Sequence, residues 1–236
     1  MSDFVSDWSL LHEASTHGRQ VTLHKLITQG YSVNLITADH VTPLHEACLG
    51  GHHGCAAILL KHGAKYGASP HAVCDVASPI HEACKRGHTE CAESLSNAGV
   101  SIEQYINHLG SPLYVACENG KVETARRLLE LGAGANVGKD LDSPLHVAAK
   151  NGNTELANLL IDYGGSMQSK NADGKRPSEI VPLHSSLQRL FLKREGPPTL
   201  KQICRLCIRK CLGRKQHHRI YQLLLPETLK EYLSYR

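Results

Sequence analysis

One position recurs along this chain at intervals of 32 to 36 residues, at the head of a run that reads Thr/Ser-Pro-Leu/Ile-His in its clearest copies. Self-similarity at this period predicts a solenoid, in which each copy buries its apolar side against its neighbours. With only two Phe and one Trp in 236 residues, burial must come from many thin aliphatic layers. The recurring position is occupied, in order, by His12, His45, His81, Tyr114, His146 and, in a degraded sixth copy, Ser178.

The copy from Thr42 to Ala64 indicates how one unit folds. Thr42 can cap a helix, and Pro43 sits at the first helical position, where its missing N–H costs nothing. His45 follows the cap by three residues and can hydrogen-bond back across that turn. Gly51 and Gly63 supply left-handed residues at the ends of two helices. Each helix is only about two to three turns long, too short to be stable alone, so the copies must stabilise one another.

This unit resembles the ankyrin repeat. The resemblance implies an all-α solenoid of about six repeats with hairpin loops, starting near residue 8 and occupying residues 1–192.

Two departures from the regular repeat pattern are expected to matter. The stretch Tyr66–Val76 predicts a longer, irregular loop, and the third copy carries Ser96 where another copy has Leu129. We therefore expect this middle junction to be the least stable part of the array.

A different kind of segment follows the repeats. Residues 193–198 predict a linker, because Pro197 and Pro198 break a helix. Three helices are predicted after this linker: from Thr199 to about Cys211, from about His217 to Leu224, and from Pro226 to about Tyr232.

The first of these helices carries an apolar stripe. Leu200, Cys204 and Ile208 lie at i, i+4 and i+8 on one face. Three further residues widen it: Ile203, Cys207 and Cys211. A short apolar stripe outside the repeats has no core of its own, so we expect it to dock on another protein.

Residues 199–236 resemble a SOCS box. In that family the first helix fits the pattern Thr/Ser/Pro-Leu-x-x-x-Cys-x-x-x-aliphatic and inserts into elongin C, and the run from Thr199 to Ile208 matches it at every position. A later stretch that begins Leu-Pro contacts cullin-5, and Thr228 stands here where the family form has a second proline. The resemblance implies elongin contacts at Leu200, Ile203, Cys204 and Ile208, and cullin contacts at Leu225, Pro226 and Leu229.

Ankyrin copies followed by this box are typical of the ankyrin-repeat and SOCS-box proteins. The segments Ile36–His40 and Arg194–Pro198 look most like the members numbered nine, five and eleven. The family implies a non-catalytic substrate-recognition subunit of an elongin B/C–cullin-5 RING E3 ubiquitin ligase, whose bound target is ubiquitinated for proteasomal degradation. The target itself is not readable from the sequence. Its contacts are expected at hairpin tips and at the single tryptophan: Trp8, Asp39, His40, His71, Asp75, His108 and Asp140.

Other functions fit the motifs less well. The cysteines 204, 207 and 211 with histidines 217 and 218 could form a zinc site, but ligands of this spacing usually sit on a tight turn, not inside a helix. The basic run from Arg205 to Arg219 could bind phosphates, but it has no interleaved aromatic residue for base stacking. No nucleotide loop or nucleophile turn is present. We expect no metal, cofactor, nucleic acid or enzymatic activity; the rival hypothesis is an ankyrin scaffold whose C-terminal helices only cap the array and recruit no ligase.

Charge divides the chain into two parts. Residues 1–188 hold 14 Lys/Arg and 19 Asp/Glu, whereas residues 189–219 hold 10 basic residues and only Glu195. No apolar stretch reaches the roughly 18 residues that a membrane helix needs, and Met1–Phe4 lacks the start of an export signal. Nine cysteines without such a signal fit reduced thiols. We therefore expect a cytoplasmic protein, with the nucleus as the alternative.

Overall fold

The computed structural model describes residues 9–64, 78–196, 199–212, 220, 222 and 224–234. Within these ranges the regular elements are α-helices, accompanied by isolated β-bridges in the hairpins. The chain divides into two compact units, residues 1–112 and 113–236. The predicted loop at Tyr66–Val76 lies outside the described residues.

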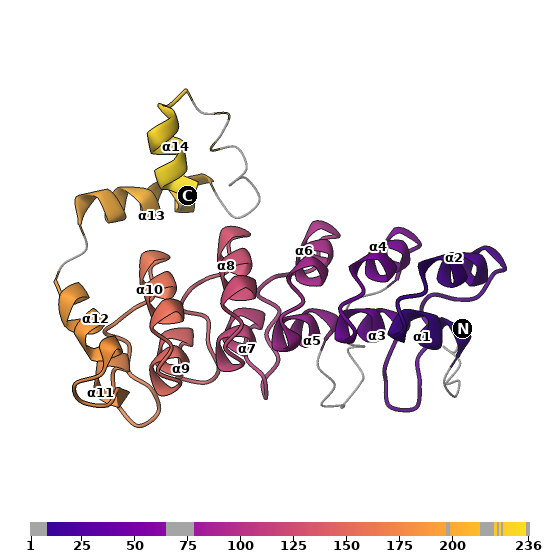
Figure 1. Cartoon of the computed structure of the whole chain (residues 1–236), viewed down its shortest axis with the longest axis horizontal. Helices are drawn as coiled ribbons and strands as arrows, with labels where there is room; N and C mark the ends of the chain where they lie inside the picture. Colours follow the sequence, from indigo (N-terminus) through magenta and orange to yellow (C-terminus); the bar gives the residue numbers. More distant parts are fainter. Residues whose placement is uncertain are drawn as a thin grey trace. The chain divides into compact units, whose positions relative to one another are not determined.

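The first unit contains three helix pairs. The first helices of the copies pack side by side, α1 on α3 and α3 on α5, and the second helices form a parallel row in which α2 packs on α4 and α4 on α6 (Figure 1). This stacking confirms the predicted solenoid. The helices are α1 Leu10–Thr16, α2 Gln20–Thr28, α3 Pro43–Leu49, α4 His53–Lys61, α5 Pro79–Arg86 and α6 Thr89–Asn97.

The second unit continues the pattern and ends in the C-terminal segment. Here α10 packs against α8, α9 and α12, and α13 packs against α14 (Figure 1). The sixth copy is degraded as predicted, because its first helix has only four residues. The helices are α7 Pro112–Glu118, α8 Val122–Glu130, α9 Pro144–Lys150, α10 Thr154–Asp162, α11 Pro177–Ile180, α12 Ser186–Arg194, α13 Leu200–Leu212 and α14 Glu227–Ser234.

The predicted cap is present at Thr42. Its hydroxyl oxygen accepts from the His45 N–H at 3.4 Å, and the ring Nδ1 of His45 accepts from the Thr42 N–H at 3.2 Å. The same reciprocal pair joins Ser143 and His146. Because both partners lie within one turn, this geometry follows from local sequence alone.

In three copies the recurring histidine also bonds to the next hairpin. Nε2 donates to a carbonyl oxygen at 3.1 Å in three copies: His12 to Val41, His81 to Gly110 and His146 to Lys175. A carbonyl can only accept, so Nε2 carries the proton and Nδ1 is left as an acceptor for the capping residue. These rings are buried. Burial lowers the pKa of His81 to about 4, because the charged ring loses its solvation.

Candidate partner-binding site

Helix α13 begins as the sequence predicts. The Thr199 hydroxyl oxygen accepts from the Gln202 N–H at 3.2 Å, so Thr199 is the N-cap. The helix then runs from Leu200 to Leu212, one residue beyond its predicted end.

The apolar stripe of α13 faces solvent. The Leu200 side chain is 77 % exposed and Ile203 is 47 % exposed. Ile208 is half-buried. The three cysteines of this helix are also exposed: Cys204, Cys207 and Cys211.

The opposite face of α13 is the one that contacts the rest of the chain. At about 100° per residue, Gln202, Arg205 and Leu206 lie across the helix from Leu200 and Cys204. The Arg205 guanidinium lies 3.5 Å from the ring centroid of Tyr232 in α14. The Gln202 Nε2 donates to the backbone oxygen of Ile161 at 3.2 Å. Gln202, Arg205 and Leu206 therefore face the rest of the chain, whereas the apolar side chains of Leu200 and Ile203 stay exposed. An ordinary surface helix buries its apolar stripe instead.

None of these inward-facing residues is among the site residues predicted from the sequence. The signal in the sequence was helical periodicity, because these residues occupy the side of the helix opposite the stripe. Their partners are up to 42 positions away along the chain, and the sequence does not indicate them.

The residues expected to contact a cullin surround the start of α14. Leu225 is half-buried, while Pro226 and Leu229 are exposed. Thr228, in place of the second proline of the family form, lies within the first turn of α14. Ile220 and Leu233 are both 1 % exposed, so these two side chains of the segment are buried. Most of the helix predicted at His217–Leu224 lies outside the described residues.

The predicted target-contacting residues lie at turn tips where the structure describes them. Asp39, His40, His108 and Asp140 are exposed. His40 and Asp140 have positive φ, 60° and 51°, which fits tight turns. Each of them lies within its own turn. Trp8, His71 and Asp75 lie outside the described residues.

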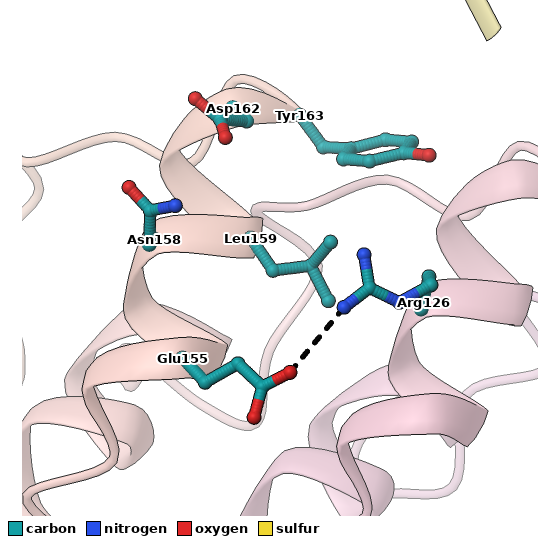
Figure 2. A pocket seen from close by; sticks show the side chains of 6 residues that line it. All are labelled: Arg126, Glu155, Asn158, Leu159, Asp162 and Tyr163. Atoms are coloured by element: carbon teal, nitrogen blue, oxygen red, sulfur yellow. Dashed lines mark hydrogen bonds and ion pairs between the residues drawn. The ribbon is translucent and has the colours of Figure 1, made fainter. Parts of the chain in front are cut away.

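A shallow pocket between α8 and α10 is too small for a cofactor. Its volume is about 130 Å³, whereas small-molecule sites are roughly 300–1,000 Å³. Figure 2 shows the Arg126 side chain reaching across to Glu155, with an Nη2–Oε1 distance of 3.4 Å, beside Leu159. The lining is Arg126, Glu155, Asn158, Leu159, Asp162 and Tyr163. The Arg126–Glu155 pair joins neighbouring repeats across this pocket.

In the described ranges, no three His, Cys, Asp or Glu side chains are grouped so that they could hold a metal ion. His217 and His218 of the zinc hypothesis fall outside those ranges. Among the same residues, none of the helices has the length and apolar character needed to cross a membrane.

The cysteines of the repeats differ from those of α13. Five of them are fully buried: Cys48, Cys55, Cys84, Cys91 and Cys117. Burial raises the pKa of the Cys117 thiol to about 12, so this side chain behaves as a small apolar group.

Comparison with known proteins assigns both parts of the chain. The family model of the SOCS box matches residues 196–234, and that of ankyrin repeats (3 copies) matches residues 11–106, 66–138 and 104–171. The crystal structure of the human ASB11 ankyrin repeat domain is 42 % identical, covers 81 % of this chain and all of that chain, and has a TM-score of 0.61.

Curated relatives match along nearly the whole chain. Ankyrin repeat and SOCS box protein 9 of Homo sapiens is 53 % identical over 99 % of this chain and 89 % of its own length. Protein 11 of Mus musculus is 46 % identical over 100 % and 82 %, and protein 5 of the same species is 41 % identical over 98 % and 79 %. The match with human protein 9 spans 262 residues, more than the 236 of this chain, so it includes residues that have no counterpart here.

Proposed function

Because this chain belongs to the family of ankyrin repeat and SOCS box proteins, we propose that it is the substrate-recognition subunit of an elongin B/C–cullin-5 RING ubiquitin ligase. Ankyrin repeats joined to a SOCS box make it an adaptor, and no catalytic domain is evident in the matched segments 11–171 and 196–234. In this role the repeats hold a target protein and the C-terminal box recruits the ligase.

The outward-facing stripe of α13 carries the proposal. Leu200, Ile203 and Cys204 form an exposed apolar row. Contact of this row with water is unfavourable, so its burial by another protein surface would be favourable. Fully burying a Leu or Ile side chain contributes about 1.5–3 kcal/mol, so two or three such residues suffice to anchor a helix in a groove. Elongin C is the occupant that the SOCS-box pattern at Thr199–Ile208 implies.

The contacts with a cullin are proposed at Leu225, Pro226 and Leu229, around the start of α14. Pro226 and Leu229 are exposed and therefore accessible to a partner. A proline at position 228 would restrict the backbone, and threonine does not. We expect the threonine in this chain to give weaker cullin binding than the proline of the family form, without affecting elongin binding.

The catalytic advantage of such a subunit is proximity. A target held by the hairpin tips stays near a ubiquitin-charged enzyme, which raises the effective concentration of the acceptor lysine. The tip residues proposed for target binding are exposed polar side chains, Asp39, His40, His108 and Asp140 among them.

Co-expression with elongins B and C, followed by gel filtration, tests the proposal. The parent chain should elute as a complex with both elongins, and the double variant Leu200→Ala/Cys204→Ala should elute without them. Leu183 has the same exposure as Leu200, 77 %, and Leu192 is 62 % exposed, so Leu183→Ala/Leu192→Ala is a matched control that should keep the complex. A parent chain that stays a soluble monomer in the presence of elongins would support the scaffold hypothesis instead, and equal losses in both double variants would refute the assigned binding face.

A further inference from the structure

A side chain of α13 in the C-terminal box contacts the end of α10. Gln202 on α13 donates to the carbonyl oxygen of Ile161, in the last turn of α10, at 3.2 Å. Two residues after α10, Gly164 faces the same helix. A Cβ placed on Gly164 would lie 3.3 and 3.4 Å from the two methyl carbons of Leu206. The inward face of α13 therefore meets α10 through one hydrogen bond and one close apolar contact.

Gly164 differs from Gly30 and Gly63, the equivalent glycines of two other repeats. Gly30, Gly63 and Gly164 each follow a second helix and have φ of 93°, 84° and 89°, the left-handed conformation that ends a helix. A Cβ would meet nothing within 4 Å at Gly30 or Gly63. At Gly164 the absence of a side chain therefore does two things. It permits the positive φ, and it leaves room for the Leu206 side chain.

The chain is also fastened to α10 just before it reaches α13. Arg194, the last residue of α12, donates from Nη2 to the Asn158 Oδ1 at 2.7 Å and pairs with the Asp162 Oδ1 at 3.1 Å. All three side chains are partly shielded from water, and two bonds from one guanidinium fix its direction. Contacts to α10 are thus made on both sides of the connection between α12 and α13, by Arg194 before it and by Gln202 after it.

We infer that this junction is a rigid mount, in which Gly164, Arg194, Gln202 and Leu206 position the SOCS box on the fifth repeat. The Arg205–Tyr232 contact extends the mount to α14, so the proposed cullin contacts move with α13. The inference rests on the proposed function for its purpose: a fixed angle between repeats and box sets where a bound target stands relative to the ubiquitin-charged enzyme. The four residues are positioning residues, and none of them belongs to the elongin-binding stripe.

A matched pair of asparagine substitutions separates this role from simple helix termination. Asparagine tolerates positive φ better than other side chains, so Gly164→Asn and Gly63→Asn impose similar backbone demands. Only the former places atoms against Leu206. Leu206→Ala removes the same contact from the other side, with Cys207→Ala on the exposed face of α13 as its control, and it provides the test if Gly164→Asn does not fold.

The readout is the distance between the array and the box in the full chain. Spin labels on noncanonical residues at Arg189 in α12 and Thr228 in α14, both exposed, leave the native cysteines in place. Pulsed dipolar spectroscopy should give one narrow distance distribution for the parent, Gly63→Asn and Cys207→Ala, and a broader or shifted one for Gly164→Asn and Leu206→Ala. Thermal midpoints should fall equally in the two asparagine variants, which would show that the distance change is not general unfolding.

Two outcomes would overturn the mount: a parent distribution as broad as that of Leu206→Ala, or equal broadening in the two asparagine variants. The distance measurement uses no elongin, so it tests the mount independently of the proposed function. The proposed function is refuted by a different result, namely that the parent chain does not bind elongins B and C.

Discussion

Acid should weaken the array through His81, and the size of the effect follows from its surroundings. The ring is 1 % exposed, and its Nε2 donates to Gly110 while its Nδ1 accepts from the Ser78 hydroxyl. Burial is the main cause that lowers its pKa from 6.5 to about 4, opposed by bonds to backbone carbonyls and assisted by nearby His108. The folded state therefore binds its second imidazole proton at lower pH than the unfolded chain does.

The sign and the pH window follow from this difference. Between pH 7 and pH 4 the unfolded chain carries more protons at this site, so the free energy of unfolding falls as pH falls. A pKa that drops from 6.5 to about 4 corresponds to a loss of about 2 kcal/mol at pH 5 and about 3 kcal/mol at pH 4. This loss is a large part of the roughly 5–15 kcal/mol that stabilises a typical domain.

The assay compares the pH dependence of urea unfolding in the parent and in His81→Gln, whose amide does not titrate. Between pH 7 and pH 4, the free energy of unfolding should fall by about 3 kcal/mol less in the variant than in the parent. Tyr114 occupies the same position of the next copy, and burial raises its pKa to about 12, so Tyr114→Phe should leave this part of the profile unchanged. Parallel pH profiles for the parent and His81→Gln, or an NMR titration of the His81 ring near pH 6.5, would refute the reasoning.

Two further substitutions test how the repeats are stabilised. Ser143→Ala removes the hydroxyl that accepts from the His146 N–H, and should lower the free energy of urea unfolding by about 1 kcal/mol. Ser143→Asn should restore most of this loss, because asparagine can also cap the helix. An alanine variant as stable as the parent would contradict the capping role. Ser96→Leu fills the half-buried site in α6 where α8 has Leu129, which is 1 % exposed, and should raise the same free energy by about 1 kcal/mol. Slower hydrogen exchange of the α6 amides should accompany the gain, and unchanged exchange would show that α6 is not a weak point of the array.

The local features of the fold could be predicted because their causes are local. The helix starts at Pro43 and Leu200 follow from Thr42 and Thr199, each of which caps amides within its own turn. Gly51 and Gly63 have the predicted positive φ. The stripe at Leu200 and Cys204 follows from helical periodicity, which also indicates that Gln202 faces the other way.

The partners of that other face could not be predicted. The contact between Gly164 and Leu206 joins residues far apart in sequence, and neither residue differs in type from many others in the chain. The ring of Tyr232 beneath Arg205 depends on how α14 folds back on α13, which no periodic pattern encodes. Long-range placement of this kind requires the assembled stack.

The division between buried and exposed cysteines gives the protein a built-in chemical reporter. Among the cysteines that the structure describes, only those of α13 are open to an alkylating reagent, since the five thiols within the repeats are sealed between helices. Brief treatment of the folded protein with iodoacetamide would modify residues 204, 207 and 211 before the five buried cysteines of the repeats. Shielding of these sulfur atoms would then report, on the unaltered sequence, how much of the protein carries a partner on its C-terminal helix.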